Sequence, residues 1–177
     1  MQFLAPRHRD LTDEEEEAII ALKSEHWPYE RSSQQQWMRS HVDASDMHCL
    51  CRQNGRACAY LRLVFREARQ EAAAFAAFGV GTVIVAKDLQ GTGLGRFLMT
   101  RTAETARSNG AEVGFLFCSE NLIPFYAGTG WSEFPAPVLQ FGAEDDGEIF
   151  SPQPTAMTFD PHMKLGAGPV HLAGAPF

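Results

Sequence analysis

The chain has 177 residues, a formal net charge of −7, 45% hydrophobic residues and 21% charged residues. This length and composition fit one folded domain with a hydrophobic core and exclude a disordered chain. The acidic balance argues against a nucleic-acid partner, because phosphates need a basic surface. The sequence has no apolar run of about 18 residues, the length that would predict a membrane span. No signal peptide is recognisable either, so we expect a cytoplasmic protein.

The first third of the chain is predicted to hold a short strand over residues 2–6 and then two helices. Thr12 to Glu15 form a capping box, so a helix is expected to begin there and to end near Trp27. A second, short helix over residues 33–41 would turn Trp37 and Met38 towards the core.

The middle of the chain is predicted to form strands and one long helix. Asn54-Gly55 indicates the turn of a hairpin over residues 47–65, because both residues tolerate positive φ. A polar turn over residues 66–71 would separate this hairpin from a strand over residues 75–86, which is almost continuously apolar and therefore typical of a sheet centre. A helix from Leu94 to Ser108 follows.

The last third is predicted to contain a strand, a short helix and a final pair of strands. They span residues 113–118, 122–129, 138–141 and 156–159. Residues 161–177 are rich in Gly, Pro and Ala, and we expect them to form a loosely held tail after a domain over residues 1–160.

The cysteines and histidines do not have the spacing of a metal site. Cys49 and Cys51 are separated by one residue, no CxxC pair exists, and only His48 lies beside a cysteine. We therefore expect no metal and reduced, mostly buried thiols. Cys118 ends a strand, and a buried structural role is favoured over that of a nucleophile.

The strongest functional signal lies between the central strand and the long helix. This loop reads Gln90-Gly91-Thr92-Gly93-Leu94-Gly95, and Arg96 follows it. Its glycines leave backbone N–H groups uncovered, and the helix directs its positive end at them, which predicts a phosphate site. The spacing differs from the dinucleotide fingerprint GxGxxG, and the absence of GxxxxGK[ST] excludes a P-loop.

A second motif, Phe125-Tyr126-Ala127-Gly128-Thr129-Gly130-Trp131, follows downstream. The QxxGxG loop, this motif and the order of elements together resemble the GCN5-related N-acetyltransferases over roughly residues 10–160. The resemblance implies a single α/β (α+β) domain with a central mixed, mostly antiparallel sheet and helices on both faces. It also implies direct transfer of an acetyl group from acetyl-CoA to a primary amine of a small acceptor.

The resemblance also implies which residues hold the donor. The strand segment Val83, Ile84 and Val85 would pair through its backbone with the pantetheine arm, and nearby amides would polarise the thioester carbonyl. Ser119 stands where many relatives have an asparagine, and Tyr126 would be the general acid for the leaving thiolate. The pyrophosphate would be held by Gln90, Gly91, Thr92, Gly93, Leu94, Gly95 and Arg96.

The general base and the acceptor are less well indicated. Many relatives carry a glutamate at the position of Gly81, so the amine proton would leave through backbone-held water or through Asp145 or Asp146. Those two aspartates and the net charge favour a cationic acceptor. Short matches, among them the segment His26-Trp27-Pro28-Tyr29, resemble the aminoglycoside 2-prime N-acetyltransferases.

Two further interpretations and the assembly stay open. Without a carboxylate at Gly81, the chain could be a non-catalytic acyl-CoA-binding sensor. The second interpretation is an enzyme that uses a longer acyl donor, because Gly79 and Gly81 would leave room beside the thioester. Both a monomer and a homodimer are compatible with the sequence.

Overall fold

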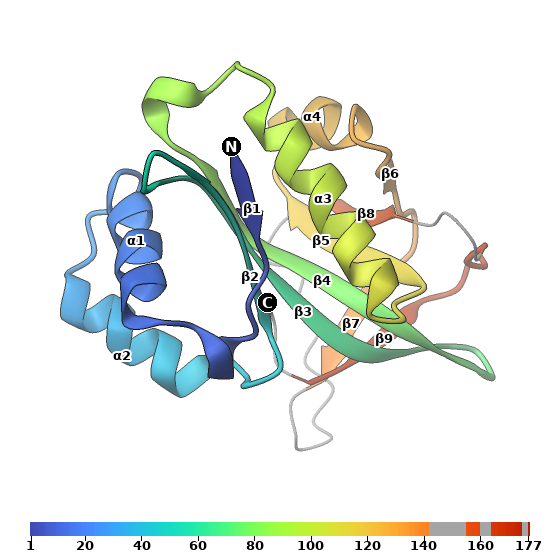
Figure 1. The fold of residues 1–177 in the computed structure, drawn as a ribbon. Helices are drawn as coiled ribbons and strands as arrows, with labels where there is room; N and C mark the ends of the chain where they lie inside the picture. Colours follow the sequence, from blue (N-terminus) through green and yellow to red (C-terminus); the bar gives the residue numbers. More distant parts are fainter. Residues whose placement is uncertain (142–154, 160–163, 175–176) are drawn as a thin grey trace. The chain divides into compact units, whose positions relative to one another are not determined.

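The computed structural model describes residues 1–141, 155–159, 164–174 and 177. The chain folds into two compact units. The first unit comprises Met1–Leu63 and Gly81–Thr105, and the second comprises Val64–Val80 and Ala106–Phe177. Three elements, labelled in Figure 1, have residues in both units. They are β3 (Arg56–Gln70), β4 (Ala73–Val85) and α3 (Leu94–Ser108).

The first unit contains the N-terminal strands in meander order. β1 (Gln2–Leu4) pairs antiparallel with β2 (Met47–Gln53), and β2 pairs antiparallel with β3. Asn54 and Gly55 have φ angles of 51° and 80°, so the predicted hairpin turn is confirmed.

Helices cover both faces of this part of the sheet. α1 (Asp13–Ser24) begins at the predicted capping box of Thr12 and Glu15, and it packs Ile19 against Leu50. The neighbouring strand residue Cys49 lies next to Thr102 of α3 instead. Since successive strand residues point to opposite faces, α1 and α3 lie on opposite sides of β2.

The remaining elements of the first unit are short. α2 (Arg31–His41) follows α1, and two 3₁₀ turns span His8–Asp10 and Lys87–Leu89. Met38 of α2 is buried, but 40% of Trp37 is exposed, so the inward orientation predicted for Trp37 is wrong. Ile20 of α1 packs against Met38 and Val42, so the face of α2 that carries Met38 is the one turned towards α1. The adjacent residue Trp37 lies on another face of the helix and points outward.

The second unit contains the C-terminal strands. β5 (Val113–Cys118) pairs parallel with β4 over Ala77–Gly79 and antiparallel with β8 (Thr155–Phe159), which in turn pairs with β6 (Ser132–Glu133). β9 (Val170–Ala173) pairs antiparallel with β3 and parallel with β7 (Val138–Phe141). The 3₁₀ turn Glu120–Leu122 and helix α4 (Ile123–Ala127) connect β5 to β6.

Three predictions for this unit are wrong, and one apolar cluster explains them. The cluster joins Ala68 and Phe75 to Phe115, Val170 and Leu172. Burial of Ala68 keeps β3 extended through residue 70, where a turn was predicted. The same cluster takes up β9, so residues 170–173 belong to the sheet rather than to a loosely held tail. β7 therefore pairs with β9, and not with β8.

The predicted fold class is confirmed: one domain with a mixed, mostly antiparallel sheet and flanking helices. Among the pairs described above, only β4–β5 and β7–β9 are parallel. Within the described residues, no helix is long and apolar enough to cross a membrane.

Candidate active site

The glycine loop gives α3 an N-terminus that no side chain caps from the N-cap position. Gly91 and Gly93 have φ angles of 76° and 88°, in the region that favours glycine. The N–H of Phe97 donates to the carbonyl of Gly93 at 3.0 Å, so Gly93 is the N-cap residue and offers no side-chain oxygen. The first-turn amides of Leu94 and Gly95 therefore have no helical carbonyl to bond, and the helix dipole favours an anion beside them.

A hollow of about 450 Å³ adjoins this loop. Its lining is mainly apolar. The lining residues are Met1, Gln53, Leu89, Thr92, Gly93, Leu94 and Phe97. The volume is within the range of small-ligand sites.

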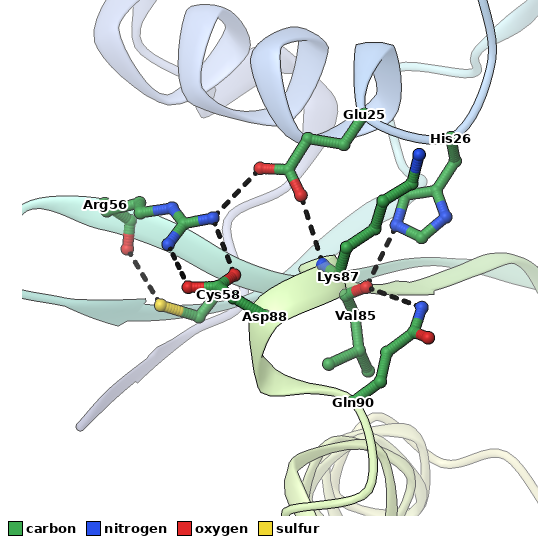
Figure 2. Close-up of polar contacts among 8 residues, drawn as sticks. All are labelled: Glu25, His26, Arg56, Cys58, Val85, Lys87, Asp88 and Gln90. Carbon is green, nitrogen blue, oxygen red and sulfur yellow. Dashed lines mark hydrogen bonds and ion pairs between the residues drawn. The ribbon is translucent and has the colours of Figure 1, made fainter.

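An ion-pair cluster holds the start of the loop against α1 (Figure 2). The Arg56 guanidinium donates to both carboxylate oxygens of Asp88, at 2.8 and 2.9 Å, and to Glu25 at 3.0 Å. Glu25 also accepts from the backbone N–H of Lys87 at 3.2 Å. The bond from Arg56 holds the pKa of Asp88 below its usual value. Because the side chains of Arg56 and Asp88 are 49% and 58% exposed, we expect the ion pairs to add little stability, and their main effect is to position the loop.

The end of β4 turns its backbone groups towards two different neighbours. The N–H of Ala86 donates to the carbonyl of Cys58 on β3 at 2.8 Å, so Val83 and Val85 direct their backbone groups to the opposite edge. On that edge the Val85 carbonyl accepts from His26 Nε2 at 2.9 Å and from Gln90 Nε2 at 3.4 Å (Figure 2). Gln90 thereby ties the loop back to the strand that precedes it.

Thr82 interrupts the regular backbone of β4. Its φ angle is 55°, which is a true outlier for a β-branched residue and costs on the order of 1–3 kcal/mol. Strain of this kind is retained where surrounding structure enforces it, most often at functional sites. Thr82 also lines a second cleft of about 450 Å³, whose other walls come from α1, α2 and the segment between them. They are Lys23, Trp27, Tyr29, Ser33, Gln34 and Trp37.

Tyr126 belongs to the second unit, on α4. Only 6% of the residue is exposed, and its ring centroid lies 5.0 Å from that of Phe125. Burial raises the pKa of Tyr126 to about 12, with a smaller contribution from Cys118. The phenol is therefore fully protonated at neutral pH. The Cys118 thiol is also buried, and burial raises its pKa, which suits a structural thiol better than a nucleophile.

The other predicted site residues fall into three groups. Val83 to Arg96 lie together in the first unit, around the end of β4 and the start of α3. Ser119 lies in the second unit, where its hydroxyl donates to Asn121 Oδ1 at 2.5 Å. Asp145 and Asp146 lie outside the described residues.

Sequence reasoning missed the cleft beside Thr82. The aromatic residues of the segment His26-Trp27-Pro28-Tyr29 are a partial signal. Lys23 and Thr82 give no signal of a site in the sequence, because a lysine in a helix and a threonine in a strand are ordinary residues. Their proximity depends on how α1 packs on β4.

Comparison with known proteins gives a family match and several similar folds. The family model described as "Acetyltransferase (GNAT) domain" matches residues 7–134. Among curated protein sequences, none matches the chain significantly.

Three solved structures illustrate the similarity of fold. Escherichia coli ElaA has a TM-score of 0.61 at 21% identity, over 90% of this chain and 100% of that one. An acyl-CoA N-acyltransferase from Pseudomonas aeruginosa has a TM-score of 0.61 at 22% identity, over 89% of this chain and 99% of that one. E. coli YhbS, solved in complex with CoA, has a TM-score of 0.63 at 12% identity, over 97% of this chain and 90% of that one.

Proposed function

The chain belongs to the GNAT family of acetyltransferases, and from this premise we propose that it transfers an acetyl group from acetyl-CoA to a primary amine of a small molecule. The observation that carries the proposal is the loop at the start of α3, where Gly93 is the N-cap residue and offers no side-chain oxygen to the amides of Leu94 and Gly95. Such a helix start binds phosphate groups through main-chain N–H donors. The pyrophosphate of coenzyme A supplies these groups.

The donor would lie along the end of β4. In this proposal, Gln90 to Arg96 hold the pyrophosphate, and the pantetheine arm pairs with the backbone of Val83 and Val85. Because the Val85 carbonyl already accepts two side-chain bonds, the arm would use the Val85 N–H or displace the longer bond from Gln90. The strained peptide at Thr82 would place an N–H group near the thioester carbonyl, where one such donor is worth about 3 kcal/mol.

The proposed reaction is a direct transfer. The neutral amine attacks the thioester carbon, the carbon–sulfur bond breaks, and the departing thiolate takes a proton from Tyr126. The amine proton leaves through water held by backbone groups or through Asp145 or Asp146. Gly81 offers no carboxylate for this step.

Two finer predictions concern the kind of acceptor and the length of the acyl donor. The likeness to aminoglycoside acetyltransferases rests on short segments and stays a prediction. The longer acyl donor loses part of its basis, because an added Cβ on Gly79 would lie 2.6 Å from the Phe177 ring, which fills the space beside that glycine.

The proposal is tested with purified protein, acetyl-CoA and a panel of amines that includes aminoglycosides, polyamines and amino acids. We expect free thiol to be released only when an amine is present, with the N-acetylated product identified by mass. Tight binding of acetyl-CoA with no release for any amine would instead support the non-catalytic sensor. The panel repeated with longer acyl-CoA donors decides the acyl chain length.

A further inference from the structure

The cleft beside Thr82 has an aromatic lining that the donor does not use. Trp27, Tyr29 and Trp37 line it, and 64% of Tyr29 and 40% of Trp37 are exposed. Exposure of large aromatic side chains around a hollow is typical of a ligand site, because flat apolar groups stack there. A volume of about 450 Å³ suits a small molecule of about one or two rings.

The charge at this cleft is positive. Lys23 lines it, and its Nζ lies 5.2 Å from the centroid of the Trp37 ring. The Arg62 guanidinium lies 5.3 Å from the centroid of the same ring. Arg62 is buried and paired with Asp46 at 3.5 Å, whereas the described residues that line the cleft include no carboxylate. An anionic group in the cleft would therefore meet Lys23 without competition from an acidic wall.

The state of Lys23 agrees with an anionic ligand. Burial and the nearby Arg62 both lower the pKa of Lys23, because each disfavours a second positive charge there. A carboxylate bound beside the ammonium would offset both effects.

The cleft also lies beside the proposed acetyl donor. Thr82 forms part of its wall, and Thr82 immediately precedes the strand segment proposed to pair with the pantetheine arm. A ligand in the cleft would therefore be next to the thioester if the arm lies as proposed.

We propose that this cleft is the acceptor site and that it selects a primary amine with a flat apolar body and a carboxylate, an aromatic amino acid being the simplest example. The inference rests on the proposed acetyl transfer and specifies its substrate class. In this arrangement, the carboxylate pairs with Lys23 and the apolar body packs against Trp27 and Tyr29. The Trp37 ring borders the cleft but already stacks with His41, with the ring centroids 5.5 Å apart. This substrate class departs from the cationic acceptor that the net charge and Asp145 and Asp146 favour.

A binding experiment tests the ligand class without requiring turnover. Tryptophan fluorescence is followed during titration with N-acetyl-L-phenylalanine and with its uncharged amide, because two tryptophans line the cleft. We expect the carboxylate form to bind at least about tenfold more tightly, which is the scale of one charge-assisted hydrogen bond. Lys23→Gln should remove this preference, and Lys23→Arg should keep most of it. Lys164→Gln, an exposed lysine outside the cleft lining, is the matched control and should behave as the wild type.

A kinetic experiment with phenylalanine, phenylalaninamide and spermidine separates the two proposals. We expect Lys23→Gln to raise KM for phenylalanine about tenfold and to leave KM for the amide unchanged. Thiol release that favours spermidine, or a loss in Lys23→Gln that is equal for acid and amide, would overturn the acceptor class while leaving acetyl transfer intact. Carboxylate-selective binding without thiol release for any amine would support the ligand class and contradict acetyl transfer.

Discussion

Burial keeps Tyr126 protonated, as a general acid must be before it acts, and at the same time makes the phenol a weaker acid. The general acid in the proposed mechanism must hold its proton until the thiolate forms, and a phenol whose pKa is about 12 does so throughout the ordinary assay range. We therefore expect Tyr126→Phe to slow thiol release about tenfold or more, with the affinity for acetyl-CoA unchanged. The rate should show no decline from phenol ionisation up to pH 9. Steady-state kinetics and calorimetric titration measure the two quantities.

Packing is the competing role for Tyr126, and a second substitution distinguishes it. Tyr126→Phe keeps the ring that contacts Phe125, whereas Tyr126→Leu removes it. If Tyr126 only packs, the Phe variant will retain full activity and the Leu variant will lose stability. An active Tyr126→Phe enzyme would therefore rule out the proposed acid.

At the scale of elements, the loop and the first turn of α3 act together as the proposed phosphate site. Gly93 has a φ angle of 88°, and nothing lies within 4 Å of the position that a Cβ would take. Gly93→Ala therefore adds backbone strain of about 1–2 kcal/mol without a steric clash. We expect the loop to relax away from this conformation, and the Kd for acetyl-CoA to rise about tenfold or more when measured by calorimetry.

Gly110 provides a control that matches this strain. It follows the C-terminus of α3, has a φ angle of 85° and likewise has open space around its Cβ position. Gly110→Ala should lower thermal stability by a similar amount and leave the Kd for acetyl-CoA unchanged. Equal weakening of binding in both variants would show that Gly93 acts through stability alone.

The elements that the sequence predicted correctly carry short-range signals. Asn54-Gly55 tolerates the φ angles of its turn, and Thr12 and Glu15 cap each other within one helical turn. β9 has no such signal, because Gly, Pro and Ala surround it and its burial comes from Phe75 and Phe115, far away in the chain.

The candidate site likewise has one part with a short-range sequence signal and one part that depends on residues far apart in the chain. The phosphate-binding prediction needs only the glycines and the helix that follows them, and the structure places Gly93 at the N-cap position of that helix. The cleft depends on Lys23 and Thr82, which are 59 residues apart in sequence and meet only after α1 packs on β4. Sequence periodicity could not place Trp37 at this cleft, since an aromatic residue on a helix is ordinarily expected in the core.

At the scale of the whole molecule, a chain of buried polar groups couples stability to pH. His48 is fully buried; its Nε2 lies 3.1 Å from His8 Nδ1, and its Nδ1 lies 2.9 Å from the Tyr60 hydroxyl. Burial, and to a smaller extent the positive charges of His8, Arg62 and Lys23, together lower the pKa of His48 to about 3. Between about pH 3 and pH 6.5, His48 is therefore neutral in the folded protein and protonated in the unfolded chain.

The sign of this effect predicts acid sensitivity. An unfolded histidine takes up its proton near pH 6.5, whereas His48 in the folded state does so only near pH 3. The contribution to stability is complete above pH 6.5 and is lost by about 1.4 kcal/mol per pH unit as the pH falls towards 3. His48→Gln should be less stable than the wild type at pH 7, but its unfolding free energy should fall less steeply below pH 6.5, as measured by urea unfolding at several pH values. The exposed His41 provides the control: His41→Gln tests whether removal of a histidine elsewhere changes the slope in the same way. Parallel slopes for wild type and His48→Gln would mean that other groups set the acid limit of this fold.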